Sequence, residues 1–479
     1  MALRNVRSRR MLLAAAAAVY GCATNPVTGE RQLALISESQ EIEMGRQAAQ
    51  QVEASIGLVE DAGLQAYVSR VGKALAAESE RPQLPWRFGV VDDPTPNAFA
   101  LPGGFIYVTR GLMGLMDSEA ELASVLGHEI GHVTARHAVS MLSRAQLAQL
   151  GLGIGMILVP ELQGLGNLAG AGLQLLFLKY GRDAEHQADE LGFRYALSEG
   201  YDVREMADVF RTLQRASQAE GQSPLPTWLS THPYPAERIQ RTGERIAALQ
   251  PPQTNPTVGR AEYLNELEGL VYGENPRNGY FRDGVFLHPE LRFRLDFPQD
   301  WRTQNLAQSV MAVSPQQDAA IELTLAQGTP ESAARSFLGQ QGIQAAAPRS
   351  HSVNGLPAVS ARFRAQTEQA VLDGIALFVA HGGNTYMLVG YAPSQRFPAN
   401  ESTLERSLGS FAVLRDPQAL NVRPNRIEIV RVQQPTTLAD FNRRNPSAID
   451  LQELALINQL ADASASVPAG TLLKRVVGG

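Results

Sequence analysis

Two histidines and a glutamate in the first third of the chain have the spacing of a metal site. The residues His128-Glu129-Ile130-Gly131-His132 form an H-E-x-x-H motif. On an α-helix, positions i and i+4 share one face, so both imidazoles can reach one ion. Neutral imidazoles suit Zn²⁺, and Glu129, one residue along, can approach the ion's open position without binding it. The motif therefore predicts a metal-activated water with Glu129 as its general base.

The sequence around the motif favours a metal site over the alternative of two structural histidines on a partly buried helix. Ser118-x-x-Glu121 is a capping box that opens the helix, and apolar residues follow at helical spacing. Gly127 and Gly131 leave the helix surface near the histidines without side chains. Because glycine weakens a helix, its presence here indicates that another element packs closely against this face.

A zinc site of this kind requires a third protein ligand. The metzincin pattern would place a glycine and a histidine at positions that are Ala135 and Ala138 in this chain, so that class is excluded. A later helix offers Glu185 and Asp189, which lie four residues apart on one face. Glu185 would bind the ion, and Asp189 would hold the second ring nitrogen of a zinc histidine. His186 is the rival ligand, pointing about 100° away from Glu185 around the helix.

Four motifs occur in an order that resembles the zinc peptidase family of HtpX, BepA and the CAAX prenyl proteases. They are His128 to His132, Glu185-x-x-Ala188-Asp189, Thr231-His232-Pro233 followed by Glu237-Arg238-Ile239, and the run from Asn97 to Gly104. The resemblance covers roughly residues 25–250 and concerns the soluble or lipidated bacterial branch. It implies a gluzincin fold, one Zn²⁺ per chain, Glu185 rather than His186 as third ligand, and endopeptidase activity on misfolded or misassembled envelope proteins.

The same resemblance implies that His232 lies near the zinc, with Arg238 close by. His232 could donate a hydrogen bond to the oxyanion formed during attack. It could instead occupy the fourth zinc position, which would make the resting enzyme latent. The alternative is a surface histidine beside a proline turn, since Pro224, Pro226, Pro233 and Pro235 are expected to exclude regular helix here. His137, five residues past His132 and off its face, is interpreted as structural.

A hairpin before the motif helix is the predicted substrate-binding element. Its turn is Pro102-Gly103-Gly104, and the strand from Phe105 to Val108 is predicted to lie at a sheet edge. An edge offers unpaired backbone groups to which an extended peptide can add as another strand. The predicted substrate-binding residues are Asn97, Ala98, Phe99, Phe105 and Tyr107.

The N-terminal sequence has the features of an export signal. Arginines from Arg4 to Arg10 precede a short apolar run, and Gly21 precedes Cys22. The residues before Cys22 resemble a bacterial lipobox, which predicts removal of residues 1–21 and lipidation of Cys22. Ser8 to Leu12 also resembles a twin-arginine signal, so the export route stays open. By resemblance, Ala23 after the cysteine favours anchoring at the outer membrane in the bacterial periplasm.

The length of the chain predicts several domains, and its pattern of helical and strand-like stretches predicts a multidomain α+β protein. The chain has 479 residues, of which 44% are hydrophobic and 19% are charged, with a formal net charge of −6. This charge excludes a nucleic-acid binder by electrostatics, and the single cysteine excludes an intrachain disulfide. Beyond the signal, the predicted domains are a mainly helical metallopeptidase domain with a small sheet at 22–255, an α+β accessory domain at 276–415 and a βααβ unit at 424–479. Within the first domain, the apolar stretch from Gln146 to Leu178 is predicted to be a buried or membrane-touching helical hairpin.

The two C-terminal domains resemble non-catalytic modules. The accessory domain is similar to PsbP-like α/β domains and carries no metal or nucleophile cluster. The last unit resembles LysM, a glycan-binding module, although Pro435-Thr436 replaces its usual Gly-Asp. Possible partners are therefore peptidoglycan through this unit and the membrane through a lipid anchor. Besides an envelope endopeptidase, the sequence leaves open a chaperone-like binder with latent protease activity and a hydrolase of peptidoglycan crosslinks.

Overall fold

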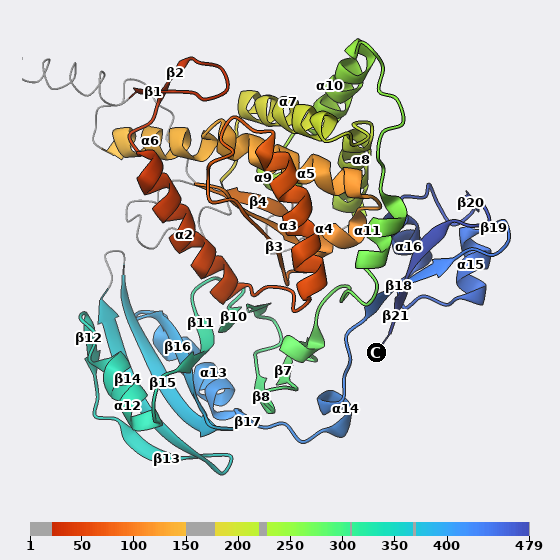
Figure 1. Ribbon diagram of the computed structural model, residues 1–479. Coiled ribbons are helices and arrows are strands. Elements are labelled where there is room, and N and C mark those ends of the chain that lie inside the picture. The colour runs from red at the N-terminus through yellow and green to blue at the C-terminus, as the bar shows by residue number, and fades with distance from the viewer. Residues whose placement is uncertain (1–21, 150–177, 220–227, 307–308, 367–369, 479) are drawn as a thin grey trace, which may run out of the picture. The chain divides into compact units, whose positions relative to one another are not determined.

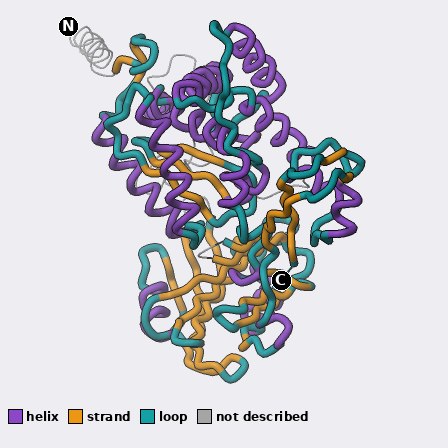
Figure 2. The backbone as a smooth tube through the Cα atoms, turned by 45° about the vertical axis from the view of Figure 1, so that its right-hand side comes forward, coloured by secondary structure: helices purple, strands orange, loops and turns teal. Residues whose placement is uncertain are grey.

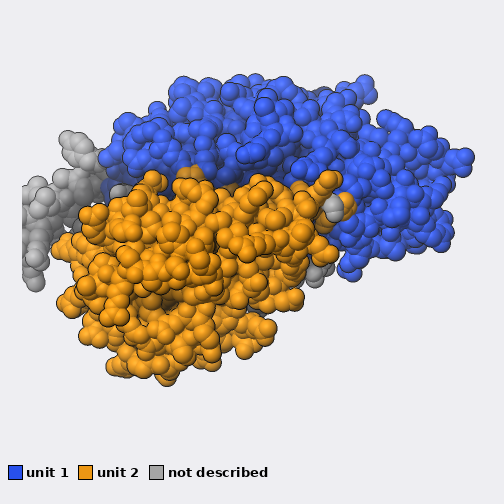
Figure 3. All heavy atoms as spheres, turned by 90° about the horizontal axis from the view of Figure 1, so that it is seen from below, with its two compact units in different colours: residues 1–53, 57–272, 426–477 blue, residues 54–56, 273–425, 478–479 orange. Residues whose placement is uncertain are grey.

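The computed structural model describes residues 22–149, 178–219, 228–306, 309–366 and 370–478. Two compact units make up this chain (Figure 3). Unit 1 comprises the residues up to 53, residues 57–272 and residues 426–477. Unit 2 consists mainly of residues 273–425. The predicted export signal and most of the apolar stretch from Gln146 to Leu178 lie outside the described residues. No described helix is long and apolar enough to cross a membrane.

Unit 1 is mainly helical (Figures 1 and 2). Its helices are α2 (Glu38–Ser55), α3 (Ala62–Ala77), α4 (Arg110–Leu115), α5 (Glu119–Thr134), α6 (His137–Gln149), α7 (Arg182–Ser198), α8 (Glu205–Ala219), α9 (Trp228–Thr231), α10 (Pro235–Ala248), α11 (Arg260–Glu266), α15 (Leu438–Arg444) and α16 (Leu451–Ile457). Its strands are β1 (Cys22–Thr24), β2 (Arg31–Leu33), β3 (Arg87–Val91), β4 (Ala98–Leu101), β5 (Phe105–Thr109), β18 (Arg426–Arg431), β19 (Thr436–Thr437), β20 (Ser466–Val467) and β21 (Leu472–Val477).

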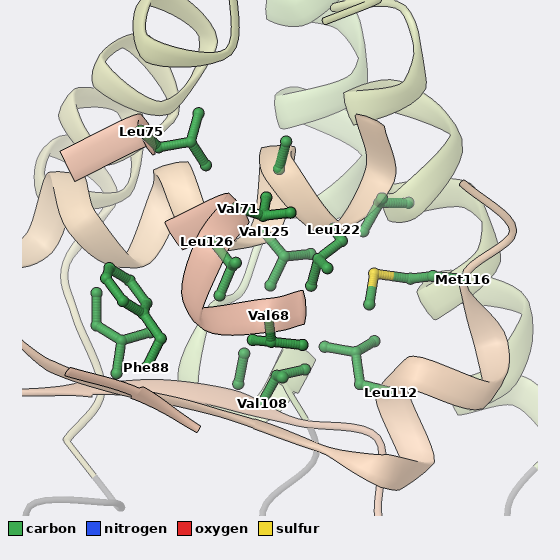
Figure 4. Close-up of a cluster of buried hydrophobic side chains, with 14 of the residues drawn as sticks. Val68, Val71, Leu75, Phe88, Val108, Leu112, Met116, Leu122, Val125 and Leu126 are labelled. Carbon is green, nitrogen blue, oxygen red and sulfur yellow. The ribbon is translucent and has the colours of Figure 1, made fainter. Parts of the chain in front are cut away.

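A three-stranded sheet and the helices α3 and α5 enclose the main core of unit 1 (Figure 4). Strand β5 pairs with β3 in parallel and with β4 in antiparallel register. Side chains of α3 such as Val68 and Val71 meet Leu122 and Leu126 of α5 over Val108 of the sheet. The predicted hairpin is confirmed as β4–β5, and the core holds α5 against its sheet.

The predicted start of the motif helix is confirmed. Ser118 is the N-cap of α5, and its hydroxyl accepts a hydrogen bond from the Glu121 backbone nitrogen at 3.1 Å. The Glu121 carboxylate accepts from the backbone nitrogen of Asp117 rather than from that of Ser118, so the capping box closes one residue further out. The predicted helix that carries Glu185 and Asp189 is confirmed as α7, from Arg182 to Ser198.

The last segment of the chain packs on the motif helix and its neighbours. Strands β18 and β21 are antiparallel and flank α15 and α16, which is the predicted strand, helix, helix, strand order. Its small core includes Leu115 of α4 and Ala216 of α8. Lys474 of β21 is fully buried and donates to the carbonyl oxygens of Gly114 and Met116 at 2.9 and 2.8 Å. The segment therefore covers the end of α4 and the start of α5.

Unit 2 is an α+β structure built on antiparallel strands. A large sheet has the order β12 (Ile343–Ala345), β14 (Leu356–Gln366), β15 (Val371–His381), β16 (Asn384–Pro393), β11 (Ala320–Ala326), β10 (Ser309–Val313) and β9 (Arg302–Asn305), with β13 (Arg349–Val353) paired to β14. A second sheet has the order β17 (Ala412–Val413), β8 (Phe293–Asp296), β7 (Val285–His288) and β6 (Tyr280–Arg282). The remaining elements are η4 (Pro276–Asn278), α12 (Pro330–Leu338), α13 (Phe397–Gly409) and α14 (Pro417–Leu420).

Alternation along β15 shows how unit 2 buries both faces of its large sheet. Ala376 and Phe378 pack with residues of α12, whereas Ile375, Leu377 and Val379 pack with α13 and the second sheet. This is the period of two that a pleated strand requires. Strands β15 and β16 form a hairpin in which His381 pairs with Asn384.

Candidate metal centre

The H-E-x-x-H motif lies where α5 crosses α7. A Cβ added to Gly131 would lie 2.9 Å from the Ala188 carbonyl oxygen, and one added to Gly192 would lie 2.6 Å from the His128 nitrogen. A side chain at either glycine would push the two helices apart. The close approach predicted from the glycines of the motif is thus confirmed, and it brings Glu185 of α7 up to both motif histidines.

Four buried donor atoms converge at this crossing. They belong to His128, His132, Glu185 and His232, and all lie within 4.8 Å of one another. His128 Nε2 is 3.0 Å from His132 Nε2 and 3.2 Å from His232 Nδ1. Glu185 Oε1 is 3.5 Å from His132 Nε2 and 3.1 Å from His232 Nδ1. His186, the rival third ligand, bonds Glu237 instead, at 2.9 Å.

The four donors suit one zinc ion. Tetrahedral ligands about 2.0–2.1 Å from Zn²⁺ are about 3.3 Å apart. Four of the six donor separations run from 3.0 to 3.5 Å, and all six lie within 4.8 Å. Imidazole nitrogen and carboxylate oxygen are ligands that zinc prefers. Among the described residues, no group donates a hydrogen bond to Glu129 Oε2 or Glu185 Oε2, although both are buried and Arg238 Nη1 lies 3.3 Å from Glu185 Oε2 as an ion-pair partner. A cation would satisfy this surplus of acceptors.

Asp189 and Arg238 support His128 from behind. The Nδ1 of His128 is 2.9 Å from Asp189 Oδ1, so an Nδ1–H can donate to the carboxylate and leave Nε2 free to bind a metal. Arg238 donates to both Asp189 oxygens, at 2.8 and 2.6 Å. Burial raises the pKa of Asp189, but the Arg238 charge and the hydrogen bonds outweigh burial and hold that pKa well below its usual value. Asp189 is therefore an anion that fixes the His128 ring.

The interpretation of His137 as a residue off the His132 face is wrong. Its Nδ1 lies 2.9 Å from His132 Nδ1, and its Nε2 lies 3.0 Å from Gln187 Oε1. The helical extrapolation fails because α5 ends at Thr134, and Arg136 adopts φ +57° before α6 begins. Burial lowers the pKa of His137 to about 4, so its ring is neutral.

Trp228 orients the predicted general base. Its Nε1–H donates to Glu129 Oε1 at 3.3 Å, and its ring stacks on that of His232. His232 Nε2 is 3.5 Å from the same Glu129 oxygen. Sequence reasoning missed Trp228 as a site residue, although its position one helical turn before His232 was a usable signal. It also missed Tyr180, whose ring stacks on His132 at 4.0 Å and for which the sequence carries no comparable signal.

The segment that carries His232 and Arg238 is more helical than predicted. A single turn, α9, runs from Trp228 to Thr231, and the His232 nitrogen donates to the Trp228 carbonyl oxygen at 2.8 Å. Pro235 begins α10 rather than excluding it, because the first helical position needs no backbone N–H. Arg238 of α10 is fully buried between the rings of Phe210 and Trp228, 4.2 and 4.5 Å from their centroids. Pro224 and Pro226 lie outside the described residues.

The prediction that Phe105 to Val108 forms an edge strand is wrong. Strand β5 lies between β3 and β4, and both Phe105 and Tyr107 are buried. The edge strands of this sheet are β3 and β4, and β4 contains Ala98 and Phe99. A second neighbour for β5 could not be inferred from the hairpin alone, because β3 pairs with it across a separate segment of chain.

Comparison with known proteins agrees with this geometry. Residues 63–246 match the sequence profile of Peptidase family M48. These residues form an M48 peptidase domain. The family resemblance inferred from the four motifs is therefore confirmed.

The M48 domain is also similar to curated proteases. Over 248 residues the chain is 33% identical to a beta-barrel assembly-enhancing protease of Yersinia pestis, covering 50% of each chain. It is 33% identical over 186 residues to the mitochondrial metalloendopeptidase OMA1 of Schizosaccharomyces pombe, covering 38% of this chain and 53% of that one. The chain thus spans about half the length of the curated relatives it matches.

Solved structures add little for the rest of the chain. Cyanobacterial PsbP from Synechocystis aligns with 28% of this chain and 94% of its own at 12% identity. Its TM-score of 0.24 is too low to support a shared fold.

Proposed function

We propose that the chain is a zinc metalloendopeptidase whose reaction takes place at the crossing of α5 and α7. The observation that carries this proposal is the convergence of four buried donors from His128, His132, Glu185 and His232, with the Glu129 carboxylate beside them. Structural histidines have no reason to converge on a carboxylate in this way, whereas a zinc site requires it.

The chemistry follows from the donors and from the base. A bound Zn²⁺ would lower the pKa of a water to about 7 and polarise a peptide carbonyl. Glu129 accepts the proton of the attacking water and later delivers it to the leaving amine. Trp228 holds one Glu129 oxygen through its N–H, which leaves the other oxygen for that proton.

His232 makes the resting arrangement latent in this proposal. Its Nδ1 lies among the donors, so that three imidazoles and a carboxylate would together hold the ion with four ligands. Catalytic zinc sites keep one position open, whereas closed four-ligand sites are structural. Activity then requires His232 to leave the set. Its Nε2 already faces Glu129. Once it has left the zinc ligands, the His232 ring would be available to donate a hydrogen bond to the oxyanion formed during attack.

Substituting His232 separates its two roles. We expect His232→Ala to retain zinc and to raise basal turnover, because the fourth position opens. Loss of turnover with zinc retained would instead assign His232 to oxyanion stabilisation. Turnover and zinc content can be measured on the same purified sample.

Substrates are proposed to add to the outer edge of β4. The Thr109 nitrogen donates to the Asn97 carbonyl oxygen, so alternation along the pair directs the backbone groups of Ala98 and Ala100 outward. Ala98 is fully buried and Ala100 is partly exposed, so strand addition requires rearrangement at this edge. This requirement agrees with a latent resting state. Backbone pairing would favour extended, misfolded or misassembled envelope proteins over folded ones.

The proposed location is the bacterial periplasm, with Cys22 lipidated and anchored at the outer membrane. A lipobox-like sequence before the single cysteine supports this. Stable anchoring needs more than one acyl chain, which a modified N-terminal cysteine provides. We expect Cys22→Ser to move the protein from the membrane fraction to the soluble fraction. A wild-type protein found soluble with an intact thiol would contradict the proposal.

The remaining parts of the chain are proposed to present or retain substrate. Unit 2, predicted to be PsbP-like, offers no buried catalytic cluster among its described residues. The LysM-like segment within unit 1 is the proposed contact to peptidoglycan. A chaperone-like role with weak proteolysis and a peptidoglycan hydrolase are the competing functions.

One experiment separates these functions. The purified protein is incubated with an unfolded outer-membrane protein and with peptidoglycan, each with and without chelator. We expect chelator-sensitive cleavage of the unfolded protein alone.

Glu129→Gln should keep zinc and lose cleavage by at least about a hundredfold, because only the base is removed. Glu185→Ala should lose zinc; equal metal content in this variant and in the wild type would contradict its role as a ligand.

A further inference from the structure

The two motif histidines are supported by different chemistry. Behind His128 stands an ion pair, because Asp189 accepts from its ring and is itself held by Arg238. Behind His132 stands a neutral chain, first the His137 ring at 2.9 Å and then the Gln187 amide at 3.0 Å. A carboxylate can only accept a proton, so it fixes the neighbouring tautomer directly. An imidazole can donate or accept at either nitrogen, so His137 cannot fix His132 unless its own tautomer is fixed.

We propose that Gln187 and His137 are positioning residues that together decide which nitrogen of His132 carries its proton. The inference deepens the proposed zinc site and rests on it. Gln187 Oε1 can only accept, so His137 Nε2 must carry the hydrogen. A neutral imidazole has one N–H, so His137 Nδ1 is then an acceptor. It receives the Nδ1–H of His132, whose Nε2 is left with a free lone pair that points at the donor cluster.

The opposite arrangement is incompatible with metal binding. If Gln187 presented its NH₂ group to His137, the His137 proton would move to Nδ1. His132 would then have to accept at Nδ1 and carry its proton on Nε2, the atom 3.0 Å from His128 Nε2 in the cluster. A protonated ring nitrogen cannot bind zinc. The orientation of the Gln187 amide thus sets the tautomer of His137 and, through it, the tautomer of the zinc ligand His132.

Local structure holds both rings of this relay. The left-handed turn at Arg136 brings His137 back toward α5, and Arg136 donates to Glu41 and to the Ile36 carbonyl oxygen, each at 2.9 Å. Tyr180 stacks on His132 and fixes its plane. Helix α7 supplies the amide of the relay as well as Glu185, so the helix that provides the third ligand also sets the tautomer of the second.

The test is zinc affinity of the full-length protein, measured by competition with a chromogenic chelator. Gln187→Met removes the hydrogen-bond acceptor of His137, and His137→Phe removes the ring that accepts from His132. Each substitution should weaken zinc binding by about 10- to 100-fold. His137→Asn places an amide oxygen where Nδ1 stood, so it should keep an affinity close to that of the wild type. Gln187→Met made in the His137→Asn background should then have no further effect, because the relay is bypassed. Gln240→Met, at an exposed glutamine of α10, is the matched control.

A purely structural role for these residues predicts a different pattern. It predicts loss of stability in all variants, which melting in excess chelator measures without zinc, and equal losses of affinity for His137→Asn and His137→Phe. Either that equality or a Gln187→Met variant with wild-type affinity would overturn the relay while leaving the zinc site intact. A wild-type protein that binds no zinc would overturn the proposed function itself.

Discussion

Unit 1 buries acidic and basic side chains, and unit 2 keeps such side chains at its surface. Among the described residues of unit 2, the buried polar side chains are the uncharged Ser314, Thr385 and Ser407. The charged side chains buried in unit 1 include Glu41, Arg81, Asp117, Glu121, Glu129, Glu185, Asp189, Arg238 and Lys474. Removing a charge from water costs several kcal/mol unless it is paired. The described core of unit 2 therefore bears no cost of buried charge, whereas unit 1 bears a cost that packing does not explain.

The buried charges of unit 1 gather at the two ends of α5. At one end are the metal donors with Asp189 and Arg238. At the other end, Lys474 lies 2.8 Å from Asp117, and Gln459 donates to Glu121 at 2.6 Å. Burial and the Asp117 charge raise the pKa of Glu121. The motif helix is thus held at both ends, by the metal donors with Asp189 and Arg238 at one end and by the C-terminal segment at the other.

Removing the contacts of Lys474, at the end of α5 that is distant from the metal donors, should have the largest effect on stability. Lys474→Met leaves Asp117 without this buried partner and two carbonyl oxygens without a donor. We expect a loss of about 3–5 kcal/mol, measured by urea unfolding of the full chain. Asp117→Asn added to this variant should recover part of the loss. A loss below about 1 kcal/mol would contradict this role of Lys474.

Removing zinc should destabilise unit 1 and spare unit 2. A ligand present at a thousandfold excess over its Kd stabilises the folded state by about 4 kcal/mol. Hydrogen exchange with and without chelator should therefore change in α5 and α7 and remain constant in β14 to β16. Equal changes in both units would show that the metal is not held by unit 1.

Lowering the pH should test the one strongly shifted histidine of the described part of unit 2. Burial lowers the pKa of His288 to about 4, and its Nδ1 accepts from the Leu291 nitrogen at 3.2 Å. Above pH 6.5 the His288 ring is neutral in both the folded and the unfolded chain. Between pH 6.5 and 4 the unfolded chain binds a proton at this ring that the folded chain does not. Stability should fall over that range, by at most about 3 kcal/mol. Hydrogen exchange of β7 and β8 measures this, and His288→Asn should remove the slope.

The smallest effect is expected at a surface ion pair. Arg364 and Asp373 bond each other in unit 2, with the Arg364 side chain 57% exposed. Arg364→Met should cost no more than about 1 kcal/mol, less in high salt. It is the matched control for Lys474→Met. A comparable loss at both sites would mean that burial does not distinguish the two units.

Local pattern was enough to predict the elements that carry the site. The capping residues, the i to i+4 histidines and the small residues of α5 and α7 predicted two helices in close contact, since each signal acts within a turn or two of helix. The same holds for the β4–β5 hairpin and for the order of elements in the last segment. The family motifs supplied Glu185, His232 and Arg238 as candidates.

Only the tertiary structure decided which partners those residues meet. The pairing of β3 with β5 and the contact of Lys474 with Asp117 join distant segments whose approach depends on how several elements pack together. The contact of His137 with His132 depends instead on the left-handed turn at Arg136, which the helical spacing does not reveal. The sequence pattern also could not show that His232 stands among the donors, because its position depends on a turn of helix held by Trp228 and on Arg238 buried between two rings. Local periodicity determines which faces a segment presents, and the packing of many segments determines what lies opposite each face.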